Sequence, residues 1–146
     1  MAETYGGNIT VVPGAREFSF HGSGTIYEGR LVEVATNVVP ATGDYTVKLA
    51  SENSSCVLGY IDTEWEDDDM VVVYTGPAIA RLEANTAIAI GQPVAADGSG
   101  KIKQYLPTAE EAASGCVVGI ALEAITASTF GKVFVNIVPN PVPGVN

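Results

Sequence analysis

Residues 115–138 constrain the fold more than any other part of this chain. They contain two apolar runs rich in β-branched residues, 115–122 and 132–138, separated by a polar loop and Gly131. This pattern is typical of a β-hairpin. Because side chains alternate along a strand, Val133, Val135 and Ile137 face one side of the second run, and Phe134 and Val138 share the other with Asn136. A strand that is apolar on both faces needs cover on both, from its own fold or from a neighbouring subunit.

Composition extends this interpretation to the whole chain. The 146 residues fit one domain, and 47% hydrophobic with only 16% charged residues excludes disorder. Sixteen glycines and eight prolines, with little helical periodicity, predict many short strands separated by turns. We expect an all-β fold, a small β-barrel or β-sandwich. The expected strands are residues 8–12, 17–20, 30–35, 45–50, 56–61, 70–74 and 78–82, followed by the hairpin.

The second half of the chain repeats the first. The phrase that begins at Gly29 returns at Gly91, 62 positions later, and the phrase Cys-Val-x-Gly at Cys56 returns at Cys116, 60 positions later. The valine run 71–73 corresponds to 133–135. The sequence therefore predicts two related β units, 29–82 and 91–138, that close on one core within a single domain of residues 25–138.

The two ends are expected to be extended. Residues 1–24 are rich in glycine, which predicts an N-terminal arm that lies along another body such as a neighbouring subunit; the alternative is an edge hairpin packed on its own domain. Residues 139–146 form a Pro-rich C-terminal tail. One short helix is predicted before the hairpin, with Thr108 as N-cap, Glu111 completing a capping box and Gly115 beyond its end.

The net charge of −10 argues against nucleic acid and against anionic membrane surfaces as partners. No apolar run approaches the ~18 residues of a membrane span. The first residues lack the basic and apolar regions of a signal peptide, so we expect synthesis in a cytoplasm.

Candidate chemistry is sparse. Cys56 and Cys116 lie in apolar runs, which predicts buried free thiols; a disulfide, or a metal or catalytic role, is the alternative. The single histidine, His21, has no triad partner at a recognisable spacing, and no phosphate-binding or nucleophile motif is present. We expect no catalytic residue, no metal site and no cofactor.

The acidic run of residues 64–69 is the most distinctive local feature. It could be a solvated hairpin loop, a contact for a basic partner surface, or a calcium site, although the spacing of a calcium loop is missing. Trp65 within it is expected to anchor on a neighbouring surface or to cover the apolar face.

Three phrases in order, residues 29–35, residues 91–102, and residues 117–124 followed by 131–135, resemble the small β-rich capsid cement, or head decoration, proteins of tailed bacteriophages. The resemblance implies a β-tulip-like fold and a non-enzymatic virion protein on the outer capsid surface. Such a protein binds the outside of the mature head as a homotrimer and stabilises it by clamping neighbouring major capsid protein subunits.

The resemblance also implies that the N-terminal arm reaches onto the capsid lattice. Together with the acidic loop, this gives a set of candidate partner contacts: Tyr5, Ile9, Val11, Phe18, Phe20, Trp65, Glu66, Asp67 and Asp68. The alternative function is a binding module for carbohydrate or a host surface on a virion, with Trp65, Tyr60 and Tyr74 as stacking faces. A hydrolase that uses Cys116 or a serine is a weaker third possibility.

Overall fold

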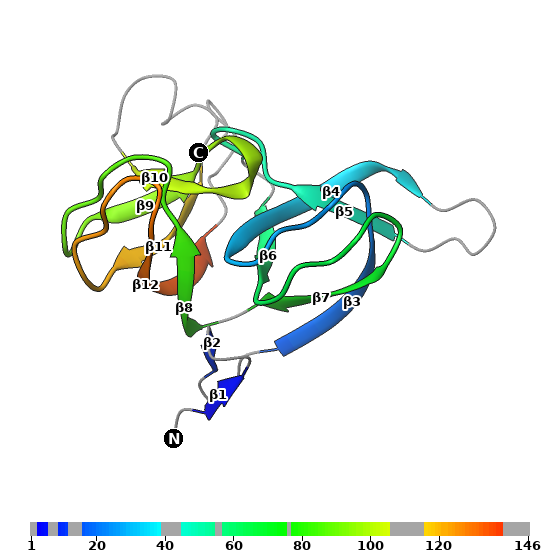
Figure 1. Cartoon of the computed structure of the whole chain (residues 1–146), viewed down its shortest axis with the longest axis horizontal. Coiled ribbons are helices and arrows are strands. Elements are labelled where there is room, and N and C mark those ends of the chain that lie inside the picture. The colour runs from blue at the N-terminus through cyan, green and yellow to red at the C-terminus, as the bar shows by residue number, and fades with distance from the viewer. Residues whose placement is uncertain are drawn as a thin grey trace.

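A computed structural model describes residues 3–5, 9–11, 16–38, 45–54, 57–75, 77–105 and 116–138. The described chain is almost entirely β-structure, which confirms the predicted all-β class (Figure 1). Its first half forms a closed five-stranded barrel in the order β3-β5-β4-β6-β7. These strands are β3 (Arg16–Gly22), β4 (Arg30–Val38), β5 (Tyr45–Leu49), β6 (Val57–Ile61) and β7 (Met70–Thr75).

The second half forms a seven-stranded sheet beside the barrel, in the order β1-β2-β8-β12-β11-β9-β10. Its edge begins with a hairpin from the N-terminus, which pairs with β8. The strands are β1 (Glu3–Tyr5), β2 (Ile9–Val11), β8 (Ala78–Glu83), β9 (Pro93–Ala96), β10 (Ile102–Gln104), β11 (Val117–Ala121) and β12 (Phe130–Val138). A three-residue 3-10 turn, η1 (Gly98–Gly100), separates β9 from β10.

The predicted hairpin is confirmed as the antiparallel pair β11–β12. Val133 and Val135 are fully buried on one face, whereas Phe134 is half-buried and Asn136 exposed on the other. Gly119 allows the two strands to approach, because a Cβ atom at this position would lie 2.1 Å from the Phe134 carbonyl oxygen. The hairpin is therefore covered by the protein core on one face and left partly open on the other.

The same pattern of backbone hydrogen bonds occurs once in each half of the chain. Ile26 and Trp65 exchange reciprocal backbone hydrogen bonds of 2.9 and 2.8 Å, and Ile88 and Ile125 do the same at 2.9 Å. Parallel pairing of β3 with β5 closes the barrel at Gly22↔Val47, and a single parallel bridge, Ala84↔Ile102, stands at the corresponding place in the second sheet. Ile26 and Ile88, like Gly22 and Ala84, are 62 positions apart, and Trp65 and Ile125 are 60 apart, as in the sequence repeat. Val47 in β5 and Ile102 in β10 do not follow these offsets.

The core joins the two halves. In β4, Val32 points into the barrel, where it packs with the other barrel residues, while its neighbour Leu31 packs against the second sheet. In β6, Ile61 and Tyr60 divide in the same way. These strands are buried on both faces, so the barrel and the sheet fold around a common apolar layer.

Several predictions can be placed on this architecture. Residues 16–22, which fall within the predicted arm, form β3 and complete the barrel. The predicted helix, the C-terminal tail and Cys56 lie outside the described residues. No helix in the described part of the chain is long and apolar enough to cross a membrane.

Candidate functional site

The junction between the barrel and the second sheet begins at the turn before β4. Gly29 adopts a φ of +68°, and its carbonyl accepts a 2.9 Å hydrogen bond from the Glu83 backbone N–H at the end of β8. A Cβ atom on Gly29 would lie 2.3 Å from the Phe130 ring. Both the positive φ and the close ring require glycine here. The turn therefore docks on the second sheet without a side chain of its own.

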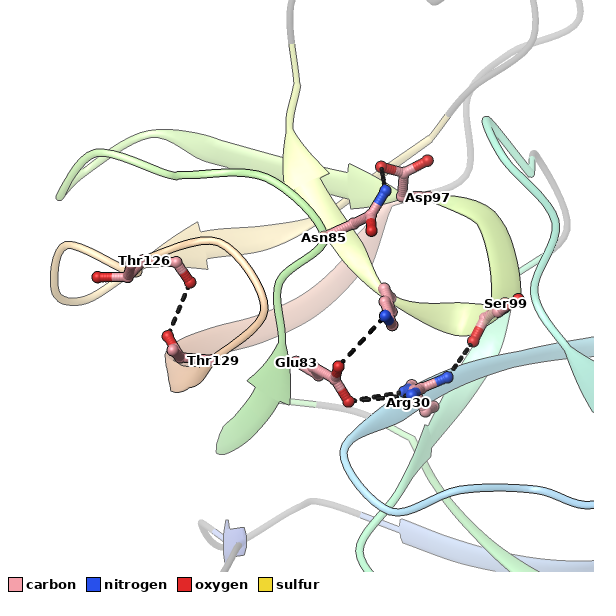
Figure 2. A network of polar contacts seen from close by, with 8 residues as sticks. Arg30, Glu83, Asn85, Asp97, Ser99, Thr126 and Thr129 are labelled. Carbon is pink, nitrogen blue, oxygen red and sulfur yellow. Dashed lines mark hydrogen bonds and ion pairs between the residues drawn. The ribbon is translucent and has the colours of Figure 1, made fainter.

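An ion cluster seals this junction, as Figure 2 shows. Arg30 donates from Nε and Nη2 to Glu83 Oε1 at 3.2 and 3.0 Å, and from Nη1 to the Ser99 carbonyl at 2.8 Å. Lys101 Nζ lies 3.3 Å from the other Glu83 oxygen. The Arg30 and Glu83 side chains are only 12% and 16% exposed. One carboxylate thus ties the start of β4 to β8 and to the segment after η1.

Neighbouring loops are fixed by shorter-range polar contacts (Figure 2). Asp97 accepts from Gly98 N–H at 2.8 Å and from Asn85 Nδ2 at 2.9 Å, which holds the turn at residues 97–100 against the segment after β8. Thr129 Oγ1 donates to the Thr126 carbonyl at 2.7 Å in the β11–β12 loop. These hydrogen bonds fix the conformation of two turns in the second sheet.

The acidic loop, residues 64–69, connects β6 to β7 as predicted and is exposed apart from Trp65. Two of its carboxylates accept hydrogen bonds from backbone N–H groups: Asp67 Oδ1 from Gly24 at 2.7 Å, and Asp69 Oδ2 from Glu66 at 2.9 Å. Asp68, at a φ of +70°, lies 3.6 Å from His21 Nε2. Among the described residues, no group of three or more His, Cys, Asp or Glu side chains could hold a metal ion.

Trp65 packs against the barrel core and is half-buried. This agrees with the predicted cover over the apolar face. Tyr60 is fully buried and stacks on Tyr74 with ring centroids 5.9 Å apart. A buried ring offers no face to a sugar, so the idea that Tyr60 is a stacking platform is wrong.

Negative charge concentrates around the barrel. Burial raises the pKa of the Asp62 carboxyl; a backbone hydrogen bond opposes this shift, and the charges of Glu17 and Glu28 reinforce it. Burial also raises the pKa of the Tyr60 hydroxyl, with smaller contributions from Tyr74 and Asp62. Asp62 is therefore a buried carboxyl in a negative environment, immediately before the acidic loop.

The structure divides the predicted partner contacts into two groups. Phe18 and Phe20 lie on β3 opposite Val73 and Val71; Phe20 packs against the barrel core, whereas Phe18 is 47% exposed. The end of β3 adjoins the acidic loop through hydrogen bonds between Gly22 and residues 68–69. The other contacts lie on the second sheet, where Tyr5 pairs with Ile9 and Val11 pairs with Ala78.

Cys116 is buried, as predicted, and its Sγ donates to the Ser54 carbonyl at 3.3 Å. Its thiol is therefore not accessible to a substrate in this conformation.

The Arg30–Glu83 pair was not found from the sequence. The partners are 53 residues apart, and no local pattern marks them. The only available signal was the repeat, in which Gly29-Arg30 corresponds to Gly91-Gln92 and so differs in charge between otherwise similar phrases.

The fold is similar to a solved structure described as the head fiber gp8.5 N base in bacteriophage phi29. The TM-score is 0.63 at 15% sequence identity, and the match covers 84% of this chain and 94% of the other. This similarity shows a shared fold. No protein-family model and no curated protein sequence matches the chain.

Proposed function

We propose that this chain is a structural protein of a phage virion that binds the outside of the mature head. In this role it stabilises the head by clamping neighbouring major capsid protein subunits. The proposed partners are the major capsid protein and further copies of the chain, as a homotrimer, and the proposed role is structural rather than enzymatic. The observation that carries the proposal is the fold shared with a phage head fiber base over most of both chains.

The described residues support this proposal in a second way. The polar groups that lie close together serve folding: Arg30 and Glu83 seal a junction, Asp97 caps a turn, and Cys116 is buried. Exposed side chains, by contrast, include large apolar residues such as Ile90 and Tyr45, at 66% and 67%. Many weak surface contacts, repeated over a lattice, can add up to tight binding through effective concentration.

Co-sedimentation with phage heads tests the proposal. The purified chain is mixed with expanded heads built from the major capsid protein of the same phage, and with unexpanded heads as the control. We expect saturable binding to expanded heads and an increase in the temperature at which they disrupt. A chain that stays in the supernatant with both kinds of head would contradict the proposal.

A further inference from the structure

The exposed face of the second sheet carries a compact set of apolar and cationic side chains. We define this outer patch as Arg81, Ile120, Leu122, Lys132 and Phe134. Ile120 lies directly opposite Phe134, and Lys132 directly opposite Arg81, on adjacent strands. Because the alternate residues Val133 and Val135 are buried, Lys132 and Phe134 point away from the core. Ile120 and Leu122 are 46% and 42% exposed.

Among the described residues, neither the Arg81 nor the Lys132 side chain forms an ion pair with a carboxylate. The Arg81 guanidinium lies over the Phe130 ring, 5.8 Å from its centroid. Like charges directly opposite each other on neighbouring strands destabilise a sheet. A bound anionic surface would remove the repulsion between Arg81 and Lys132, since it would neutralise both charges.

The chain itself carries such a surface. Residues 16–75 contain eleven Asp and Glu against three Lys and Arg, whereas residues 77–138 contain five against four. Five of the acidic residues lie in the acidic loop, where Glu64 and Glu66 are exposed and their side chains form no hydrogen bond or ion pair with another described residue. Met70, next to the loop, is 47% exposed. The loop thus combines carboxylates with an apolar side chain, as the outer patch combines cations with apolar side chains.

We propose that the acidic loop of one copy of the chain binds the outer patch of a second copy, head to tail. This inference deepens the proposed self-association by naming its two surfaces. Carboxylates of the loop pair with Arg81 and Lys132, and Met70 packs near Ile120 and Leu122. Because the two surfaces differ, the contact is heterologous, and repeated copies close into a ring if the rotation permits; closure after three copies gives a trimer.

Charge reversal tests the contact. One variant carries Arg81→Glu and Lys132→Glu, the other Glu64→Lys and Glu66→Lys. Sedimentation equilibrium of each variant alone should show association weakened roughly tenfold or more, since exposed pairs contribute modestly and two are lost. The mixture has restored charge complementarity and should associate more tightly than either variant alone. Raising the salt from 0.15 M to 1 M shortens the screening length from about 8 Å to about 3 Å and should weaken the wild-type contact.

A matched pair of isoleucine variants separates the patch from general surface effects. Ile120→Ser lies in the patch and should weaken association, whereas Ile90→Ser, at an isoleucine that is 66% exposed and outside the patch, should not. Thermal melts of each variant show whether the fold is retained. A wild-type chain that is monomeric at every concentration overturns the inference, as does association that is unchanged by charge reversal or not restored on mixing. Head binding is measured separately, so a monomer that binds heads refutes this contact and leaves the proposed function standing.

Discussion

Removing the charge of Glu83 should uncouple the barrel from the second sheet. Glu83→Gln keeps the size of the side chain but leaves Arg30 and Lys101 without their shared carboxylate. Glu83 accepts two hydrogen bonds from Arg30 and lies 3.3 Å from Lys101 Nζ. Removing one partner of a buried pair costs about 3–5 kcal/mol, and the partial exposure of these side chains reduces this figure. We therefore expect Glu83→Gln to lower the free energy of unfolding by about 2–3 kcal/mol.

Urea unfolding followed by two probes measures this effect. Trp65 fluorescence reports on the barrel. In a background in which Cys56 is replaced, the reactivity of the remaining Cys116 thiol reports on the second sheet. In the wild type the two transitions should coincide, as in a two-state unfolding. In Glu83→Gln the urea midpoint should fall, and a separate thermal melt should show a midpoint lower by about 8 °C, from about 2–4 °C per kcal/mol for chains near this size. The two transitions should also separate.

Control variants give the result its meaning. Glu64→Gln removes an exposed carboxylate that forms no hydrogen bond or ion pair with another described residue, and should change the free energy of unfolding by less than about 0.5 kcal/mol. A double-mutant cycle of Glu83→Gln with Arg30→Gln should show a coupling energy of about 1 kcal/mol or more. A Glu83→Gln loss below about 1 kcal/mol with coincident transitions would refute the view that this carboxylate joins the two halves.

Three other substitutions test separate parts of the structure. Gly119→Ala should destabilise the chain by about 3 kcal/mol in urea titrations, because its Cβ would meet the Phe134 carbonyl, whereas Gly98→Ala has open space around it and should be nearly neutral; equal effects would contradict the close approach of β11 and β12. Asp62→Asn tests the raised pKa. The folded state holds the Asp62 proton more tightly than the unfolded state, so the wild type loses stability as pH rises from the ordinary pKa of 3.8 through the raised pKa. The asparagine variant lacks this loss, so its urea midpoint relative to that of the wild type should be higher at pH 7 than at pH 4. A difference between the two urea midpoints that is the same at pH 4 and pH 7 would contradict a raised pKa of Asp62. Finally, the triple variant Glu66→Thr, Asp67→Ala and Asp68→Ser gives the acidic loop the residues of the equivalent β11–β12 loop. It should keep the fold by circular dichroism but lose self-association in sedimentation, and an undiminished association would argue against the loop as a contact.

Local pattern was enough to predict most of the strands. The alternation around Val133 and Val135 and the glycine of the Cys-Val-x-Gly phrase each act within a few residues, and each marks a real feature of the fold. The repeat offsets also matched a repeated hydrogen-bonding frame, because the same turns and bridges need the same residue types at the same spacing.

Long-range pairing could not be predicted in this way. Phe18 and Phe20 alternate as a strand should, but nothing near them in the sequence shows that β3 closes the barrel by pairing in parallel with β5. Glycines around β3 suggested an arm, although Gly22 is buried with a Cβ position 2.8 Å from Val71 Cγ2 and so has a packing role. The Arg30–Glu83 pair and the outer patch likewise depend on which strands become neighbours.

The repeated frame explains how one chain can carry two unlike surfaces. Backbone hydrogen bonds set the loops after β6 and after β11 in the same way, and Asp68 and Ser128 occupy equivalent positions with φ of +70° and +64°. Since the backbone determines the shape of each loop, its exposed side chains can differ without loss of fold. The first loop carries carboxylates, while Arg81 and Lys132 lie opposite each other on β8 and β12 of the second sheet. The acidic loop and the outer patch, which we propose to bind each other in neighbouring copies, therefore differ in their side chains although they lie on two units with the same backbone pattern.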